Sequence, residues 1–465
     1  MLRVGGMFVL VLSGLLLGWH THTQAQPNTT QTQTTPPQRA PLNVTLPEPK
    51  EHLLTPSEPT PTGDVPLLRR FIPGLADQMK ELTPFLRDTS LILHLRTFYF
   101  NSLNSNDTQN EAWAFGGWLA YKSGWLWDTF AVGAVGYTSQ PLYAPETTPG
   151  TNLLAPPQNP ILVWGQAYGQ LRYKDYALLT GYRQLVDEGY VNLNDTRMVP
   201  NTLEGVTLTG KVGPVGYNVG YLTAIKVREE GSFQNMAEAA GVLGHNRGLI
   251  LTRLSSDPFP GLYLFAANYY VPDVFNTAYG HAEYTYDFAK DTSFKIGIQY
   301  TDQRSVGAQF LGNFATWNVG TRAIFEWRGL AMGAGFTATG DNAALSTPYG
   351  AWPGYFHFQV TDFDQANQNA WGAGVRYDFG GGTLIPGFRI PGLAVLLRYA
   401  EGTNAVNPST HADLPRVREG DLDITWNIPW LKGLQLRLRN AYVAQSGDRV
   451  QQQFRIIVNY EIPLL

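Results

Sequence analysis

The 465-residue chain contains no cysteine, and only 15% of its residues are charged, with a formal net charge of -4. Without cysteine there is neither a disulfide framework nor a site for a lipid anchor. A near-neutral chain without a long Lys/Arg run has nothing to attract nucleic acid, so that partner is excluded. After residue 87, no stretch approaches the roughly 20 consecutive apolar residues that a membrane-spanning helix requires.

Signals of catalysis are also missing. The chain has no G-x-S-x-G motif, and its histidines after residue 25 do not fall at metal-ligand spacing. These histidines are His52, His94, His245, His281, His357 and His411. We therefore expect no catalytic residue, no metal and no cofactor, and we interpret the chain as something other than an enzyme. A hydrolase built into a membrane barrel is the weaker alternative.

The amino end has the pattern of a secretory signal peptide over residues 1–25. Arg3 precedes an apolar run at 4–19, and the small residues Thr23 and Ala25 stand at the positions required for cleavage after residue 25. The sequence therefore predicts an exported protein. A single uncleaved membrane anchor is the alternative, although the run is short and polar residues follow it.

Residues 26–67 are rich in Pro, Thr and Gln and poor in apolar residues, so they are predicted to form a linker that does not fold alone. Residues 68–87 form a short further segment, with a helix expected around 76–82 between Pro73 and Pro84. The remaining residues, 88–465, are predicted to form a single domain.

Apolar and polar residues alternate along most of this domain. In TWNVGTRAIFEWRG at 316–329, Trp317 and Trp327 lie on one side of an extended strand and Arg322 lies on the other. At about 3.3 Å per residue and a tilt of about 40°, the two tryptophans stand on the order of 25 Å apart, the height of the apolar band of a membrane barrel. About eighteen such segments are predicted, at 89–101, 111–123, 128–138, 162–173, 175–185, 203–212, 215–226, 246–255, 261–270, 277–287, 292–302, 316–327, 329–339, 370–379, 391–400, 420–428, 432–444 and 452–464.

The connections between these segments alternate in length. Short ones occur at 174–175, 213–214, 289–291 and 328–329, and long ones at 139–161, 186–202, 227–245 and 340–369. Short turns at one rim and long loops at the other are typical of outer-membrane barrels. We therefore predict an all-β fold, a closed antiparallel transmembrane β-barrel with its short turns in the periplasm. A soluble protein of two β-sandwiches or a propeller is the alternative.

The strand faces opposite the apolar ones carry many charges. The predicted inward cations are Arg96, Arg172, Arg183, Arg322, Arg376, Arg398, Arg437, Arg439, Arg455, Lys226 and Lys295, and the inward acids are Glu283, Glu326, Asp378, Asp421, Asp423 and Glu461. Because unpaired buried charge is prohibitive, the interior must be wet or crossed by ion pairs. Each arginine could be a paired wall charge or a solute contact, and together they indicate a path for anions.

Several motifs in this domain resemble the OprD family of substrate-specific porins. They are LRTFYFN at 95–101, NDTRMVPNTLEG at 194–205, AWGAGVRYDF at 370–379, IPGLAVLLRYAEG at 390–402, GLQLRLRNAYV at 433–443 and FRIIVNY at 454–460. The resemblance runs from about residue 88 to the end. It implies an eighteen-stranded barrel whose third loop folds into the lumen, helped by the fourth and seventh.

The resemblance also implies a function and a set of solute-binding residues. Family members pass small water-soluble molecules that bear a carboxylate, such as amino acids or organic and aromatic acids, by passive diffusion. An arginine ladder would be drawn from Arg96, Arg183, Arg322, Arg376, Arg398, Arg437 and Arg439, and acidic residues of the third loop, Asp187, Glu188 and Asp195, would face it.

The expected surroundings follow from the same interpretation. The final strand, FRIIVNYEIPLL, resembles the signal that the barrel-assembly machinery reads, although it ends in Leu465 where phenylalanine is usual. Outer-membrane lipid, lipopolysaccharide and small solutes are the other expected partners, and the protein would be a monomer or a homotrimer. A structural or adhesion barrel with a plugged lumen is the alternative function.

Overall fold

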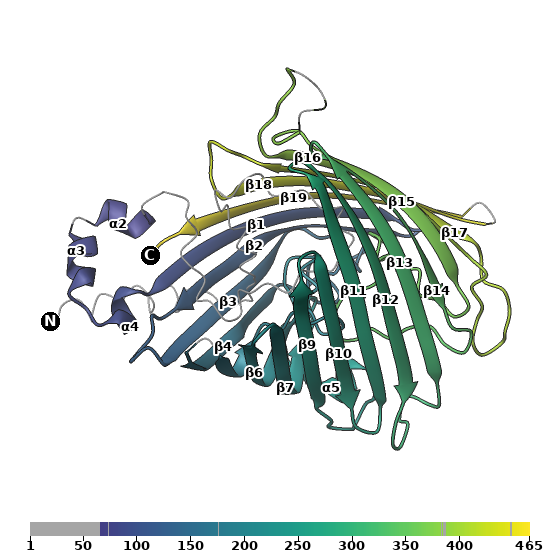
Figure 1. Cartoon of the computed structure of the whole chain (residues 1–465), viewed down its shortest axis with the longest axis horizontal. Coiled ribbons are helices and arrows are strands. Elements are labelled where there is room, and N and C mark those ends of the chain that lie inside the picture. The colour runs from purple at the N-terminus through teal and green to yellow at the C-terminus, as the bar shows by residue number, and fades with distance from the viewer. Residues whose placement is uncertain (1–65, 73, 175, 383, 385–386, 447–448) are drawn as a thin grey trace.

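The computed structural model describes residues 66–465 except 73, 175, 383, 385–386 and 447–448. The predicted signal peptide and all but the last residues of the predicted linker lie outside this part. The described residues form one antiparallel sheet that closes on itself, because β1 pairs both with β2 and with the last strand, β19 (Figure 1). Closure satisfies every strand edge, as lipid demands. The prediction of a closed antiparallel barrel is confirmed.

Eighteen of the nineteen strands form the barrel wall, and each overlaps a predicted segment. They are β1 (Ser90–Leu103), β2 (Gln109–Lys122), β3 (Phe130–Tyr143), β4 (Ile161–Tyr173), β5 (Ala177–Gln184), β6 (Thr202–Val212), β7 (Val215–Lys226), β9 (Leu249–Phe259), β10 (Leu262–Val271), β11 (Phe275–Ala289), β12 (Thr292–Ser305), β13 (Ala315–Trp327), β14 (Leu330–Thr339), β15 (Asn369–Asp378), β16 (Leu393–Thr403), β17 (Val417–Asn427), β18 (Leu434–Gln445) and β19 (Arg449–Pro463). The two-residue strand β8 (Gln234–Asn235) pairs with β7 and was not predicted.

The two faces of a wall strand differ as the alternation predicts. In β13, Trp317 and Trp327 are 42% and 37% exposed. Thr316 and Asn318, the two neighbours of Trp317 in the sequence, are only 4% and 1% exposed. The apolar side chains therefore lie on the outside of the barrel, where lipid would cover them. The polar side chains lie inside, where they hydrogen-bond to one another, as Asn318 does to Thr337 of β14 at 3.0 Å.

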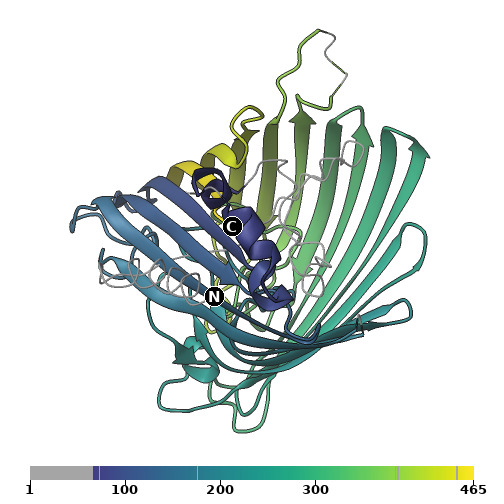
Figure 2. The same ribbon diagram turned by 90° about the vertical axis from the view of Figure 1, so that its left-hand side faces the viewer.

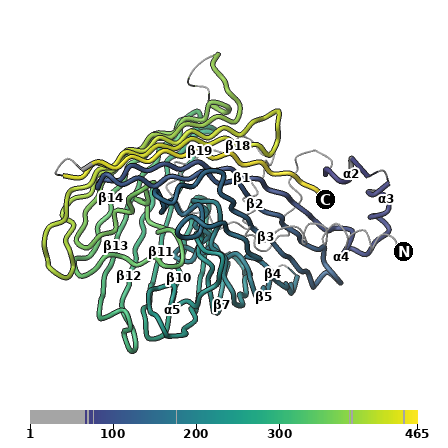
Figure 3. The backbone as a smooth tube through the Cα atoms, turned by 180° about the vertical axis from the view of Figure 1, so that it is seen from behind, coloured from purple at the N-terminus to yellow at the C-terminus, as the bar shows by residue number. Residues whose placement is uncertain are grey.

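The two rims of the barrel differ in their connections. The carboxyl end and residues 66–72 lie at the rim that carries most of the short turns, which we call the short-turn rim (Figures 2 and 3). The opposite, long-loop rim carries loop 2 (144–160), loop 3 (185–201), loop 4 (227–248) and loop 7 (340–368). Loop 4 includes β8 and the short helix α5 (Met236–Ala239), which the sequence did not predict.

Three short helices lie at the short-turn rim: α2 (Leu67–Phe71), α3 (Leu75–Lys80) and α4 (Pro84–Arg87). Only α3 was predicted. Leu75 and Met79 of α3 are buried against Leu91 of β1 and the terminal Leu465. The helices therefore cover the place where the first and last strands meet. No helix in the described part of the chain is long and apolar enough to cross a membrane.

Candidate functional site

Loop 3 crosses the barrel interior and is fastened first to β1. Both carboxylate oxygens of Asp195 accept hydrogen bonds from the Arg96 guanidinium, at 2.7 Å and 3.0 Å. Arg96 also donates to the backbone carbonyl of Arg197 at 2.8 Å and to the side chain of Asn459 on β19 at 2.7 Å. A bidentate pair of this kind fixes orientation as well as distance. It therefore sets the height of the loop in the lumen.

The other end of loop 3 is fastened to the opposite part of the wall. The Glu188 carboxylate, 1% exposed, accepts from Nε of Arg253 on β9 at 2.7 Å and from Nδ2 of Asn218 on β7 at 2.8 Å. The Tyr269 hydroxyl of β10 donates to the Glu188 backbone carbonyl at 2.7 Å. Loop 3 is thus tied to the wall by buried ion pairs at two places. The sequence did not predict a role for Arg253.

Loops 3, 4 and 7 meet inside the barrel. Asn192 of loop 3 makes a two-way contact with Ala351 of loop 7, donating to its carbonyl at 2.7 Å and accepting from its N–H at 2.9 Å. The Tyr349 hydroxyl of loop 7 donates to the carbonyl of Met236 in loop 4 at 2.7 Å. These contacts agree with the expectation that the third loop enters the lumen with the help of the fourth and seventh.

Loop 7 is seated on a stretch of wall that lacks side chains. A Cβ added to Gly372 of β15 would meet the Phe356 ring at 2.8 Å, and one added to Gly297 of β12 would meet the Tyr355 hydroxyl at 2.5 Å. Both aromatic residues are buried. Glycine at these inward positions therefore makes the space that the aromatic side chains of loop 7 occupy.

Two of the predicted wall arginines flank this seat, and each is paired with an acid. Arg322 of β13 forms an ion pair with Glu283 of β11 across Gly297, and its guanidinium lies 4.3 Å from the centre of the Tyr355 ring. Nε of Arg398 of β16 donates to Asp421 of β17 at 2.7 Å. In each case the acid offsets the cost of keeping the guanidinium partly buried.

A second group of arginines lies toward the short-turn rim. Arg437 and Arg439 of β18 share one carboxylate, Asp423 of β17, at 2.5 Å and 2.9 Å. Arg376 of β15 has no carboxylate within 4.0 Å in the described part of the chain, and its buried Nη1 has no hydrogen-bond partner there. Two arginines share one acid and the third has no ion pair within 4.0 Å among the described residues, so guanidinium donors in this part of the lumen can receive an anion.

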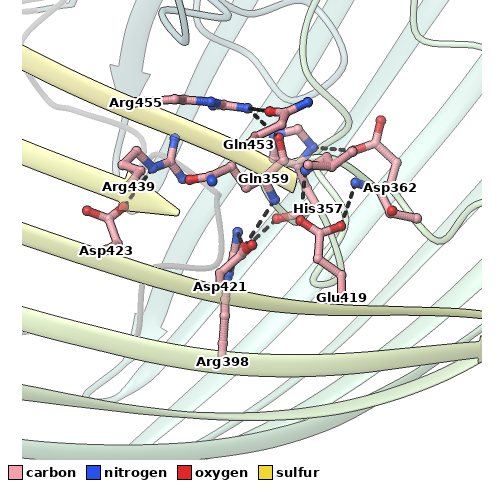
Figure 4. A network of polar contacts seen from close by, with 12 residues as sticks. His357, Gln359, Asp362, Arg398, Glu419, Asp421, Asp423, Arg439, Gln453 and Arg455 are labelled. Carbon is pink, nitrogen blue, oxygen red and sulfur yellow. Dashed lines mark hydrogen bonds and ion pairs between the residues drawn. The ribbon is translucent and has the colours of Figure 1, made fainter. Parts of the chain in front are cut away.

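Arg455 of β19 lies beside this group but contacts loop 7 (Figure 4). It is 1% exposed, it neighbours Arg439 in the strand register, and Nη2 donates to the Gln359 carbonyl at 2.8 Å. Among the described residues it has no carboxylate within 4.0 Å, and its Nε has no partner. The sequence placed Arg455 on the inner wall but left it out of the ladder.

Arg197, in the bend of loop 3 between Asp195 and Pro200, was not predicted as a site residue either. Its guanidinium donates to the backbone carbonyls of Thr151 and Thr196 at 2.8 Å and 2.9 Å. Burial, and then the neighbouring charge of Arg228, lower the pKa of Arg197 well below its usual value. An arginine stays protonated at neutral pH even so, and Arg197 places a second cation beside Arg228 in this part of the lumen.

Arg183 is not part of the lumen wall, and the expectation that it faces inward is wrong. Its register partner on β4 is Ala167, on the same face as the exposed Leu171. Its guanidinium pairs with Glu204 at 2.7 Å and lies 4.2 Å from the centre of the Phe233 ring. Arg183 thus belongs to the outer face near the long-loop rim, where a long side chain can reach polar surroundings.

Asp187 of loop 3 is half-buried beside Glu188, and its predicted contact with a solute stays a prediction. Among the residues that the structure describes, no group of three or more His, Cys, Asp or Glu side chains could hold a metal ion.

A closed barrel with an apolar outside, a charged inside and loops folded into its lumen defines the class of outer-membrane porins. The family model for "outer membrane porin, OprD family" matches residues 83–464. The chain belongs to the OprD family and is an outer-membrane porin.

Individual relatives agree with this assignment. The chain is 23% identical over 428 residues to Porin D of Pseudomonas aeruginosa, with 83% of this chain and 93% of that protein covered. The crystal structure of P. aeruginosa OccK9 (OpdG) covers 82% of this chain and all of its own at 24% identity, with a TM-score of 0.74. That of P. aeruginosa OpdK with vanillate has the same coverage at 20% identity, with a TM-score of 0.71. The crystal structure of Acinetobacter baumannii OccAB3 has a TM-score of 0.73 at 16% identity, and it covers 81% of this chain and 99% of its own.

Proposed function

We propose that the protein passes small water-soluble solutes that bear a carboxylate across the outer membrane by passive diffusion, and that its lumen arginines guide them. The observation that carries the proposal is the group on β15 and β18: Arg437 and Arg439 share one acid, and Arg376 has none in the described part of the chain. The planar guanidinium matches the fork of a carboxylate.

The arrangement suits passage rather than capture. At an effective dielectric of about 20, one carboxylate about 4 Å from one guanidinium gains about 4 kcal/mol before desolvation. Neighbouring sites let the anion move from one to the next, so that no single site retains it. Vanillate, with which OpdK was crystallised, is an aromatic carboxylate, and the same solute class fits this chain.

We assign the acidic residues of loop 3 a different role from the one that the resemblance implies. The carboxylates of Asp195 and Glu188 are engaged by Arg96 and Arg253. Their proposed role is to hold loop 3 across the lumen and so set its width. Binding of a solute ammonium group by Asp187 remains a prediction.

Flux measurements in liposomes at low ionic strength test the proposal, with benzoate and a neutral sugar as the solutes. Arg376→Gln should lower benzoate flux several-fold and change sugar flux little, and added salt should shrink the difference because screening shortens the reach of the charge. Arg183→Gln is the matched control, since Arg183 lies on the outer face. Equal losses for both solutes, or none for either, would contradict guidance by Arg376. A plugged structural barrel would conduct neither solute.

A further inference from the structure

The tip of loop 7 occupies donors of two wall arginines. Nη1 of Arg398 donates to the His357 carbonyl at 3.1 Å, and Nη2 of Arg455 donates to the Gln359 carbonyl at 2.8 Å. Backbone carbonyls thus stand where the oxygens of a solute carboxylate would be received. Figure 4 shows the tip lying between Arg455 on one side and Arg398 with Asp421 and Glu419 of β17 on the other.

The same tip is held from the other side by carboxylates of the chain itself. The Glu419 carboxylate accepts the N–H groups of Val360 and Thr361 at 2.8 Å and 2.7 Å, and Asp421 accepts the N–H of Gln359 at 3.2 Å. Three successive N–H groups therefore point at two acids. Among the described residues, the polar contacts of the tip with the wall are single hydrogen bonds to its backbone, and none is an ion pair.

Of the hydrogen bonds that hold the tip, the one from Arg455 is the least favourable chemically. A guanidinium prefers a charged acceptor, because a charge-assisted hydrogen bond is roughly twice as strong as one to a neutral carbonyl. Arg455 has only the Gln359 carbonyl and the amide oxygen of Gln453, at 2.5 Å, and its buried Nε has no partner in the described part of the chain. An arriving carboxylate could engage Nε and Nη2 together.

We propose that the tip of loop 7, residues 357–361, is an internal occupant of the arginine sites that a solute carboxylate displaces, and that Glu419 determines how readily it leaves. The inference rests on the proposed function and adds to it a competition between solute and loop. It makes conduction depend on the carboxylate group and not only on the size of the solute.

Glu419 has this role because of where it lies. It is fully buried, at 0% exposed, and it has no cation within 4.0 Å among the described residues. If the tip leaves, the Glu419 carboxylate exchanges two N–H donors that the loop holds in place for lumen water, and the return of the tip restores both charge-assisted hydrogen bonds at once. The acid therefore returns the tip to the wall. Glutamine can still accept one N–H but carries no charge, so the variant should hold the tip less firmly.

The first experiment compares two inward acids, the buried Glu419 and the half-buried Glu461, in single-channel recordings. With benzoate as the permeant anion, Glu419→Gln should lower several-fold the concentration at which the current is half-saturated. Glu461→Gln is the control, because Glu461 lies on β19 at 3.7 Å from His94 and has no contact with loop 7 among those that the structure gives. The inference would be overturned if the Glu419→Gln variant still folds into the barrel, as shown by its circular dichroism, and has an unchanged half-saturating concentration.

A second experiment fixes the tip in place. The chain has no cysteine, so the pair Thr361→Cys and Glu419→Cys offers two unique thiols. Because the Thr361 N–H meets the end of the Glu419 side chain, the thiols need a short bis-methanethiosulfonate cross-linker, which forms one reducible disulfide with each cysteine and releases methanesulfinate, rather than a direct disulfide. The uncross-linked double variant should conduct like Glu419→Gln, and cross-linking should reduce benzoate current until a reductant restores it. Each single-cysteine variant treated with the reagent is the control.

The two proposals fail in different ways. If Arg376→Gln changes nothing while the cross-link blocks and the reductant restores benzoate current, the tip is a removable occupant but Arg376 does not guide carboxylates. If cross-linked and reduced proteins conduct alike, the tip is a fixed part of the wall and the inference is wrong, whatever Arg376 does.

Discussion

Loops 3 and 7 both enter the barrel from the long-loop rim, but they are held there by different means. Loop 3 brings acidic side chains to buried wall arginines, Asp195 to Arg96 and Glu188 to Arg253. Loop 7 brings backbone groups and aromatic rings, and the charged partners in its wall contacts belong to the strands. Ion pairs fix a segment in one position, whereas single backbone bonds can be exchanged one at a time.

The difference suits the proposed division of work. Loop 3 would set a constant width, since removing one partner of a buried pair leaves an uncompensated charge. Loop 7 would yield to the solute, since each of its polar contacts has a substitute in water or in the solute itself. Changes at loop 3 should therefore alter the stability of the barrel, and changes at loop 7 should mainly alter conduction.

The largest effect is expected from Arg253→Met. Among the described residues it leaves the Glu188 carboxylate, 1% exposed, with only Asn218 as a side-chain donor, and breaking such a pair typically costs about 3–5 kcal/mol. The midpoint of urea unfolding in detergent, followed by circular dichroism, should fall accordingly.

The double variant Arg253→Met with Glu188→Gln is the matched control. Removing both charges removes the uncompensated one, so most of the lost stability should return. If the double variant is as unstable as the single one, packing of the Arg253 side chain and not its charge holds loop 3.

A smaller effect is expected from Gly297→Ala beneath loop 7. The added methyl group would meet the Tyr355 hydroxyl at 2.5 Å, and overpacking of this kind typically costs about 1–3 kcal/mol. Because only loop 7 and the end of Glu283 need to shift, open-channel current should become noisier while the barrel stays folded.

Two further variants show whether Tyr355 is the cause. Combining Gly297→Ala with Tyr355→Phe removes the hydroxyl and should restore quiet current. Gly181→Ala, where the new Cβ has nothing within 4 Å, should change neither stability nor noise. Noise that persists without the Tyr355 hydroxyl would point to the Glu283 side instead.

The wall of the barrel was predictable because lipid imposes a simple rule on it. Every outward position must be apolar, so alternation in segments such as 316–327 marks strand and face together. The partners inside the lumen follow no such rule. Arg253 lies inward on β9 together with Leu249 and Leu251, which are buried because loops 3, 4 and 7 pack against the wall there. Both faces of β9 are apolar at that height, so the alternation gave no sign of which face is inward.

Arg183 shows the opposite difficulty. A charged residue on a strand was interpreted as inward, yet Leu179 on the same strand, four positions earlier and on the same face, is 38% exposed. Near a rim, an arginine can lie on the outer face and extend toward polar groups, as Arg183 does toward Glu204. The loop contacts of Arg398 and Arg455 involve backbone carbonyls, which carry no trace in the residue types.

The smallest effect concerns Asp364, a buried acid of loop 7 that has no cation within 4.0 Å in the described part of the chain. Burial, and then the charge of Asp362, raise the pKa of Asp364 from 3.8 to about 7. The folded protein therefore binds this proton more tightly than the unfolded chain, so stability is greatest at low pH and is lost as pH rises from about 4 to about 7.

The melting temperature in detergent should fall by about 2 °C between pH 5 and pH 8 for this reason. The change is small because the loop can relax and admit water. Asp364→Asn should remove that part of the pH dependence, whereas Asn in place of the exposed Asp341 should leave it intact. Parallel curves for Asp364→Asn and the unaltered protein would show that the proton is bound elsewhere, and loop 7 would then resemble loop 3 in having no uncompensated acid.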